Sequence, residues 1–119
     1  MSKNYDLVNH NDFRDLIMYC EIMNYHICRI IEWKNGIALI ELSHNMFCVY
    51  NGHNGKGYYF NKDFVPYNWI ISQFERCSDL YKCSKDVAND IKVKSMLQLE
   101  KVKREMKRLD YWFKDKKFI

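Results

Sequence analysis

The chain has very little proline and glycine, with one Pro and four Gly in 119 residues. Disordered segments are usually rich in these two residues, so the composition predicts an ordered domain outside the chain ends. No apolar run approaches the roughly 18 residues that a membrane-spanning helix needs. The first residues also lack the apolar stretch of a secretory signal peptide. We therefore expect a cytoplasmic protein, in a bacterium or an infected host cell.

Disulfide and metal-binding patterns are missing as well. The five cysteines are odd in number and scattered through apolar surroundings, whereas a secreted disulfide scaffold favours an even and denser set. We interpret them as reduced thiols that mostly fill the core. There is no Cys-x2-Cys motif, and no two histidines have the i, i+4 spacing of a helical metal site. A metal would need convergence of distant residues such as His44, Cys48 and His53, so we expect neither metal nor cofactor.

Motifs for catalysis are equally scarce. The three glycines around Lys56 do not fit a P-loop, which needs four residues between its first Gly and the Gly-Lys pair. We expect a flexible hairpin loop there, and the alternative is a binding tip in which Lys56 meets a partner. Ser43 and His44 are adjacent on the chain, so on a strand they point to opposite faces and cannot form a catalytic dyad. An enzyme built on His44, His53 and Lys56 is the third-ranked hypothesis, and the protein is predicted not to be an enzyme.

The sequence also offers no convincing pair of carboxylates for acid–base catalysis. Glu32 and Glu41 flank the Asn35-Gly36 dipeptide, which is the strongest short signal for a β-hairpin. With those two residues as the loop, Glu32 and Glu41 are diagonal to each other at best. An ion pair with Arg29 or Lys34 is therefore favoured over a pair of carboxylates for acid–base catalysis.

What the chain does contain is a substantial apolar and aromatic load. Hydrophobic residues make up 48% of the sequence and aromatic residues 16%, enough for a real core in one domain of this length. Periodicity and turn signals predict an α+β fold with an N-terminal helix, a three- to four-stranded antiparallel meander and two C-terminal helices, the last one long and basic. The expected boundaries are a loose N-terminus at 1–9, a helix at 11–23 with Asn11 as its cap, the meander at 25–60, a helix at 66–81, the basic helix at 84–113 and a tail at 114–119.

The first predicted strand, residues 25–33, alternates poorly between apolar and polar positions. Both of its faces are fairly apolar, whereas a sheet with one solvated face alternates cleanly. We therefore expect helices on one face of the sheet and another covering, such as a second subunit, over part of the other.

Charge is distributed very unevenly. Residues 92–119 hold ten basic and four acidic side chains, a net charge of +6, while residues 1–91 carry a net charge of −2. A basic helical arm on a slightly acidic head favours a charged partner, because opposite charge steers encounter and adds affinity. Along the helix the arc opposite the apolar seam carries several basic side chains, and the candidate partner-binding residues are Lys101, Arg104, Lys107 and Arg108 together with Tyr111, Trp112 and Lys56.

Three interpretations of this arc remain open. In the first, the arc is a solvated face supported by i, i+4 pairs such as Lys101 with Glu105 and Glu100 with Arg104. In the second, it is a surface that binds an acidic protein. In the third, it is a sequence-tolerant contact with nucleic-acid phosphates. The helix lacks the Asn or Gln beside Arg that base reading would use.

The opposite, apolar seam of the same helix is short. Its spacing of 3, 4, 3 and 4 covers two heptads, fewer than a coiled coil needs. Self-association along it is compatible with every interpretation, and the residues that would form such a homodimer contact are Leu99, Val102, Met106, Leu109 and Phe113.

Two adjacent aromatic residues near the end of the helix suggest an interface. Tyr111 and Trp112 cannot both share the stripe of Phe113, so aromatic area must be exposed, meet another surface or fold back over the sheet. The favoured hypothesis is a small non-enzymatic interaction protein with a protein partner. Its size and its Asn-, Lys-, Ile- and Tyr-rich composition fit a phage or mobile-element accessory protein that inhibits a host enzyme or a defence nucleoprotein complex. The alternative is a nucleic-acid-binding protein that uses the basic helix.

Overall fold

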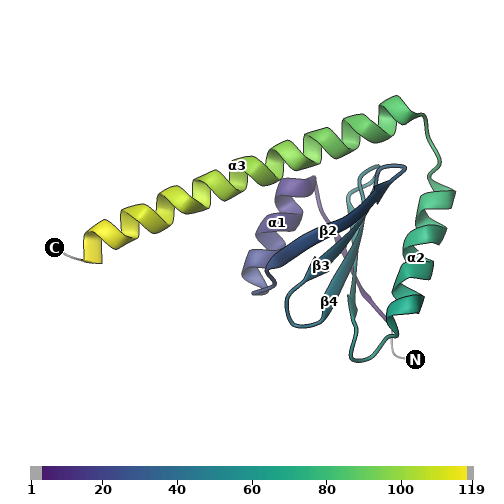
Figure 1. Ribbon diagram of the computed structural model, residues 1–119, viewed down its shortest axis with the longest axis horizontal. Helices are drawn as coiled ribbons and strands as arrows, with labels where there is room; N and C mark the ends of the chain where they lie inside the picture. The colour runs from purple at the N-terminus through teal and green to yellow at the C-terminus, as the bar shows by residue number, and fades with distance from the viewer. Residues whose placement is uncertain (1–3, 118–119) are drawn as a thin grey trace.

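The computed structural model describes the backbone of residues 4–117 and the side chains of residues 4–107. Five strands form one antiparallel sheet in the order β1-β5-β4-β3-β2, and three helices pack around it (Figure 1). The elements follow along the chain as β1 (Asp6–Asn9), α1 (Phe13–Ile22), β2 (Ile27–Lys34), β3 (Ile37–Leu42), β4 (Met46–Asn51), β5 (Lys56–Asn61), α2 (Tyr67–Leu80) and α3 (Lys85–Lys117). The predicted α+β class is confirmed.

Two details of the prediction for the N-terminal region were wrong. Residues 6–9 are not loose but form β1, which pairs with β5 and places Leu7 opposite Tyr58. A strand of four residues is too short for a period-two pattern to stand out in the sequence. The cap of α1 is Asp12 rather than Asn11, because the Asp12 carboxylate accepts a hydrogen bond from the backbone N–H of Asp15 at 3.0 Å.

The hairpins form where the sequence predicts turns. Asn35 and Gly36 have positive φ values of 52° and 81° and join β2 to β3, with Lys34 opposite Ile37. His44 and Asn45, both with φ of 60°, join β3 to β4 in the same way.

The pairing of β2 with β3 shifts register between Ile30 and Glu32, farther along the first hairpin. Arg29 therefore faces Glu41, not Leu42 as an unbroken register would require. Its Nε donates to Glu41 at 2.7 Å, which confirms the predicted ion pair. The bulge re-aims the side chains of an edge strand, which is a common role of bulges.

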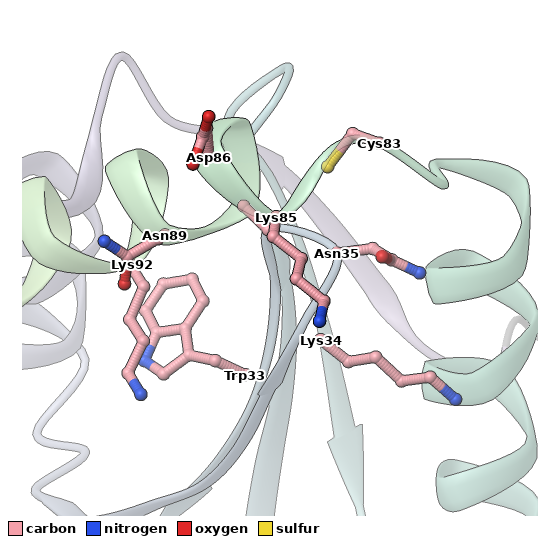
Figure 2. Close-up of a pocket in the computed structure, with 10 residues that line it drawn as sticks. Trp33, Lys34, Asn35, Cys83, Lys85, Asp86, Asn89 and Lys92 are labelled. Carbon is pink, nitrogen blue, oxygen red and sulfur yellow. The ribbon is translucent and has the colours of Figure 1, made fainter.

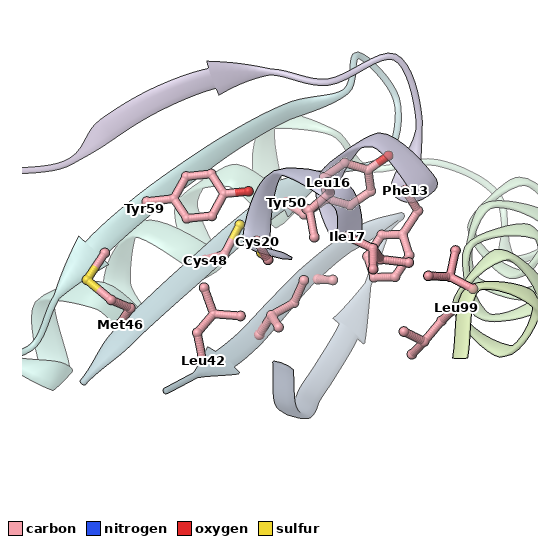
Figure 3. Close-up of a cluster of buried hydrophobic side chains, with 13 residues drawn as sticks. Phe13, Leu16, Ile17, Cys20, Leu42, Met46, Cys48, Tyr50, Tyr59 and Leu99 are labelled. Atoms are coloured by element: carbon pink, nitrogen blue, oxygen red, sulfur yellow. The ribbon is translucent and has the colours of Figure 1, made fainter. Parts of the chain in front are cut away.

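Helices cover both faces of the sheet. On one face α1 and α3 enclose a cluster to which β3, β4 and β5 contribute alternate residues, among them Leu42, Cys48 and Tyr59 (Figure 3). The opposite residues of the same strands, such as Leu39 and Val49, pack against α2. The expectation of a second subunit on the second face is wrong, because α2 of the same chain lies there. Both faces are apolar because both are buried.

Helix α3 crosses one edge of the molecule and then leaves it. Its 33 residues span roughly 50 Å at 1.5 Å per residue, close to the longest dimension of the molecule, 54 Å. Leu99 and Val102 are 6% and 2% exposed and join the core cluster under α1. The C-terminal part of α3 extends past α1 (Figure 1). None of the helices in the described region has the length and apolar character needed to cross a lipid bilayer.

Two leucines of α3 provide a matched test of this packing. Leu99→Ala removes a buried side chain, so we expect it to lower the free energy of unfolding by about 2–4 kcal/mol. Leu97→Ala, two residues away and 61% exposed, should change it by less than about 0.5 kcal/mol. Urea denaturation followed by circular dichroism measures both. Equal losses for the two variants would contradict the packing of α3 described above.

Candidate interaction surface on the C-terminal helix

The start of α3 rests on the tips of two hairpins. Ser84 caps the helix, its hydroxyl accepting from the backbone N–H of Val87 at 3.2 Å, as its position before the helix suggests. Ile91 then packs on Gly36 and Gly52. A β-carbon on Gly52 would clash with Ile91 and lie 2.7 Å from the carbonyl oxygen of Gly36, so this close approach needs glycine.

The glycine-containing loop between β4 and β5 forms part of the surface on which the start of α3 packs. Its backbone is tied by hydrogen bonds from Gly52 N–H to the Gly36 carbonyl at 2.9 Å and from His10 N–H to the Gly55 carbonyl at 2.8 Å. The Asn54 side chain donates to the Tyr81 hydroxyl at 3.1 Å. The segment expected to be a flexible loop is thus a packed junction that positions α3.

A groove lies between the first hairpin and the start of α3 (Figure 2). It has a volume of about 560 Å³ and is lined by Trp33, Lys34, Lys85, Asn89 and Lys92 among others. The Lys34 ammonium pairs with Glu75 of α2 at 2.7 Å, which raises the pKa of Lys34 through that hydrogen bond and charge. The lining of the groove is polar and mixed in charge, because Asp86 lies in it together with Lys85 and Lys92.

Farther along, α3 is tethered to α1 by side chains at the edge of the core. The Gln98 amide donates to the Asp12 carboxylate at 3.1 Å, and Arg14 pairs with Glu105 at 2.9 Å. Met96 and Met106 are partly buried against the same cluster. In the described part of α3, these contacts end at Glu105 and Met106, so the helix beyond them forms a projecting arm, which we call the basic arm (residues 107–117).

The basic candidates predicted from the sequence lie on the outer side of α3. Lys101, Arg104 and Lys107 are all exposed. None of the ion pairs found among residues 4–107 involves them. The predicted Glu100–Arg104 pair is not formed within this region, and Glu105 binds Arg14 of α1. These cations therefore present positive charge to the solvent.

Other predicted site residues are not gathered at this surface. Lys56 is half-buried on β5, opposite Asn9 of β1, and its backbone N–H donates to the Asn54 side chain. Lys56 does not line the hollow that lies between the glycine-containing loop and α3. The side chains of Arg108, Tyr111 and Trp112, and of Leu109 and Phe113 in the proposed dimer seam, fall outside the described side chains. The first three residues of that seam, Leu99, Val102 and Met106, pack against the core of their own chain.

The histidine-based enzyme hypothesis finds its residues far apart. His44 precedes β4 and His53 follows it, so the strand separates them by roughly 20 Å. His53 stacks on Tyr81 with ring centroids 5.4 Å apart, and its Nε2 lies 2.7 Å from the Asn35 carbonyl oxygen. In the described region no three potential ligand residues are grouped to hold a metal ion.

A buried polar cluster that the sequence did not predict lies under α1. His10 Nε2 and the Tyr59 hydroxyl share a hydrogen bond of 2.8 Å. Cys20 and Cys48 are buried beside the same Tyr59 (Figure 3). Burial raises the pKa of Cys20 to about 11, and that of Cys48 even more clearly. These thiols are held protonated, which suits core packing and not nucleophilic chemistry.

Burial also affects His10 itself. Its side chain is 1% exposed, and Asp15 is 3.8 Å from Nδ1. Desolvation lowers the His10 pKa below 6.5, and the Asp15 charge opposes that shift only in part. The folded state therefore favours neutral His10, which is compatible with its hydrogen bond to Tyr59.

Comparison with known proteins found no matching family model, no matching curated protein and no matching solved structure.

The pKa of His10 predicts a pH dependence of stability. A base with a lowered pKa in the folded state binds fewer protons there than in the unfolded chain, so stability is complete above about pH 6.5 and falls as the pH drops below it. The free energy of unfolding should decrease between pH 7.5 and 5.5 in urea titrations. His10→Gln should flatten this dependence, while His26→Gln, at an exposed position, should leave it unchanged. An equal slope in His10→Gln and wild type would contradict the assignment.

Proposed function

We propose that this protein acts by binding another protein, and that the basic arm of α3 is its docking surface. The observation that carries the proposal is the division of α3 into a packed part and a projecting part. Residues up to Met106 hold the helix on the sheet and on α1. The helix continues for a further 11 residues, from Lys107 to Lys117. Packing on the core does not account for this extension, although most helical stability in proteins comes from the packing of one face.

The charge of the arm indicates the chemistry of the partner. Residues 107–117 contain five basic and two acidic side chains, and Lys107 is exposed. Positive charge attracts an acidic surface over a distance of several ångströms and accelerates association. Tyr111 and Trp112 add aromatic residues to the same arm, and Tyr, Trp and Arg are the residue types that most often dominate interface energies.

A protein partner is favoured over nucleic acid by this mixture of features. Nucleic-acid contacts that do not depend on sequence rest mainly on cations that follow the phosphates, and aromatic side chains can add stacking on the bases. In the arm, Asp110 and Asp115 place negative charge among the cations. Phosphates would repel these carboxylates, whereas a protein surface can offer basic side chains that pair with them. An inhibitor or adaptor of a host enzyme or defence complex, encoded by a phage or mobile element, is the biological role that best fits a small binding protein of this kind.

The experiment that tests the proposal is a pull-down of the tagged full-length protein from its native or infected host, carried out with and without nuclease and with reducing agent present throughout. We expect a defined protein partner that survives nuclease. The triple variant Lys107→Ala, Arg108→Ala and Trp112→Ala should recover about tenfold less of it, because both charge and an aromatic anchor are lost.

The matched control carries Lys82→Ala and Lys85→Ala, which remove two exposed cations at the opposite end of α3. It should retain the partner. Recovery of nucleic acid alone, lost on nuclease treatment or at high salt, would contradict the proposal in favour of a phosphate-binding arm. Equal recovery of a protein partner by the arm variant and by wild type would exclude the arm as the docking surface.

A further inference from the structure

The outer side of α3 carries a second stripe that none of its contacts with the core explains. Because an α-helix has 3.6 residues per turn, positions spaced by four and three residues fall on one face. Six such positions follow one another on the side away from the core, and all six are exposed: Asp86, Asp90, Val93, Leu97, Glu100 and Arg104. No other element covers this side of α3 in the view of Figure 1.

The stripe is ordered by chemistry. Its centre is apolar, with Val93 and Leu97 exposed by 47% and 61%. Its N-terminal end is acidic, with Asp86 and Asp90, and the Asp86 carboxyl lies on the side of the helix away from Trp33 (Figure 2). Its C-terminal end holds Glu100 and Arg104 in the stripe and Lys101 beside it, two basic side chains and one acidic, so it carries a net charge of +1. An apolar centre between ends of opposite charge is self-complementary when two such helices run antiparallel.

We propose that this face is the contact between two copies of the chain, which pair through α3 in antiparallel orientation. A spacing of four and three residues is the seam that antiparallel helices use when they pack with a small crossing angle. The register that places Val93 of one copy against Leu97 of the other does so twice, by two-fold symmetry. In this register, facing positions add to 190.

Charge complementarity selects this arrangement over its competitors. Positions adding to 190 place Asp86 of one copy opposite Arg104 of the other, again twice, and bring Asp90 next to the neighbouring Lys101. A parallel pair would instead place Asp86 against Asp86 and Arg104 against Arg104, and like charges at such distances are unfavourable. The antiparallel register also places Asp90 of one copy opposite Glu100 of the other, which is unfavourable. Lys101, next to Glu100 on the same copy, reduces that repulsion.

The inner seam does not offer the same contact. Leu99 and Val102 are buried in the core of their own chain, so the homodimer expected from the sequence along that seam would have to open the fold. The outer stripe requires no rearrangement. It contributes two apolar side chains per copy, which is small for an interface, so the dimer should be weak and should depend on salt.

The proposed pair leaves the basic arm free. Position 105 lies opposite Lys85, the first residue of α3, and residues 107–117 extend past the end of the partner helix. Two arms would then point in opposite directions from one dimer. This inference does not rest on the proposed function, because the stripe at 86–104 and the arm at 107–117 are separate segments.

Sedimentation equilibrium of the full chain at low ionic strength, with reducing agent to keep the exposed Cys28 from cross-linking, tests the proposal. The wild type should form a dimer that weakens as salt is added. Leu97→Lys should raise the dimer Kd by about tenfold or more, which corresponds to one decade of the equilibrium constant. Leu80→Lys, at a leucine of α2 that is 74% exposed, is the matched control and should leave the Kd unchanged.

Charge reversal tests the register. Asp86→Arg and Arg104→Asp should each weaken self-association, because each replaces two attractive contacts with two repulsive ones. An equimolar mixture of these two variants should dimerise again, since both contacts across the heterodimer are then between opposite charges, and the double variant should also recover. Lys103→Asp makes the same charge change as Arg104→Asp, one residue away and about 100° around the helix, and should have a smaller effect.

Thermal unfolding of each variant guards against loss of folding as the cause. A wild type that remains monomeric at about 1 mM would overturn the proposal and assign the stripe to a different chain. A dimer that survives Leu97→Lys would exclude this face. A mixture of the charge-reversal variants that fails to associate, when each variant is folded, would exclude the antiparallel register.

Discussion

The central strands β3 and β4 are apolar on both faces, and the rest of the structure depends on that constraint. In β4 all six residues are buried, and in β3 five of six. A sheet of this kind cannot leave either face in water, because each exposed apolar side chain would forgo about 1.5–3 kcal/mol of burial. The chain therefore places α1 and α3 on one face and α2 on the other, and the loops that connect these helices follow from the need to cross between faces.

Helix α3 covers the part of the sheet that α1 leaves uncovered. The face under α1 is wider than a helix of ten residues can cover, so Ile91, Leu99 and Val102 extend the covering toward the hairpin tips and the edge strand. The seat at Gly36 and Gly52 fixes where α3 begins, and the Arg14–Glu105 pair lies near the point where it leaves. Such an exposed pair contributes little to stability by itself, so the direction of the projecting arm is set mainly by apolar packing between these two points.

The sequence predicted what local chemistry determines. The Asn35-Gly36 hairpin, the Ser84 cap and the long basic helix were all readable because each depends on a few neighbouring residues. The β1 strand was not, since its stability comes from pairing with β5, which lies about 50 residues away, and from the His10–Tyr59 hydrogen bond. The shift of register in β2 was equally hidden. No residue marks it, and only the resulting pairing of Arg29 with Glu41 makes it visible.

The outer surface of α3 could also be predicted only in part from the sequence. Periodicity located one apolar seam on α3 and treated the opposite arc as polar, which is correct on average. That average concealed Val93 and Leu97, because two apolar residues among charged ones do not alter a helical moment appreciably. Their importance becomes clear only from the fold. The inner seam of α3 is buried against the core, whereas Val93 and Leu97 on the outer side are exposed to solvent. On this basis we propose that α3 uses its inner side for its own fold and its outer side for a second copy of the chain. The docking surface proposed on the basic arm belongs to a separate segment of the same helix.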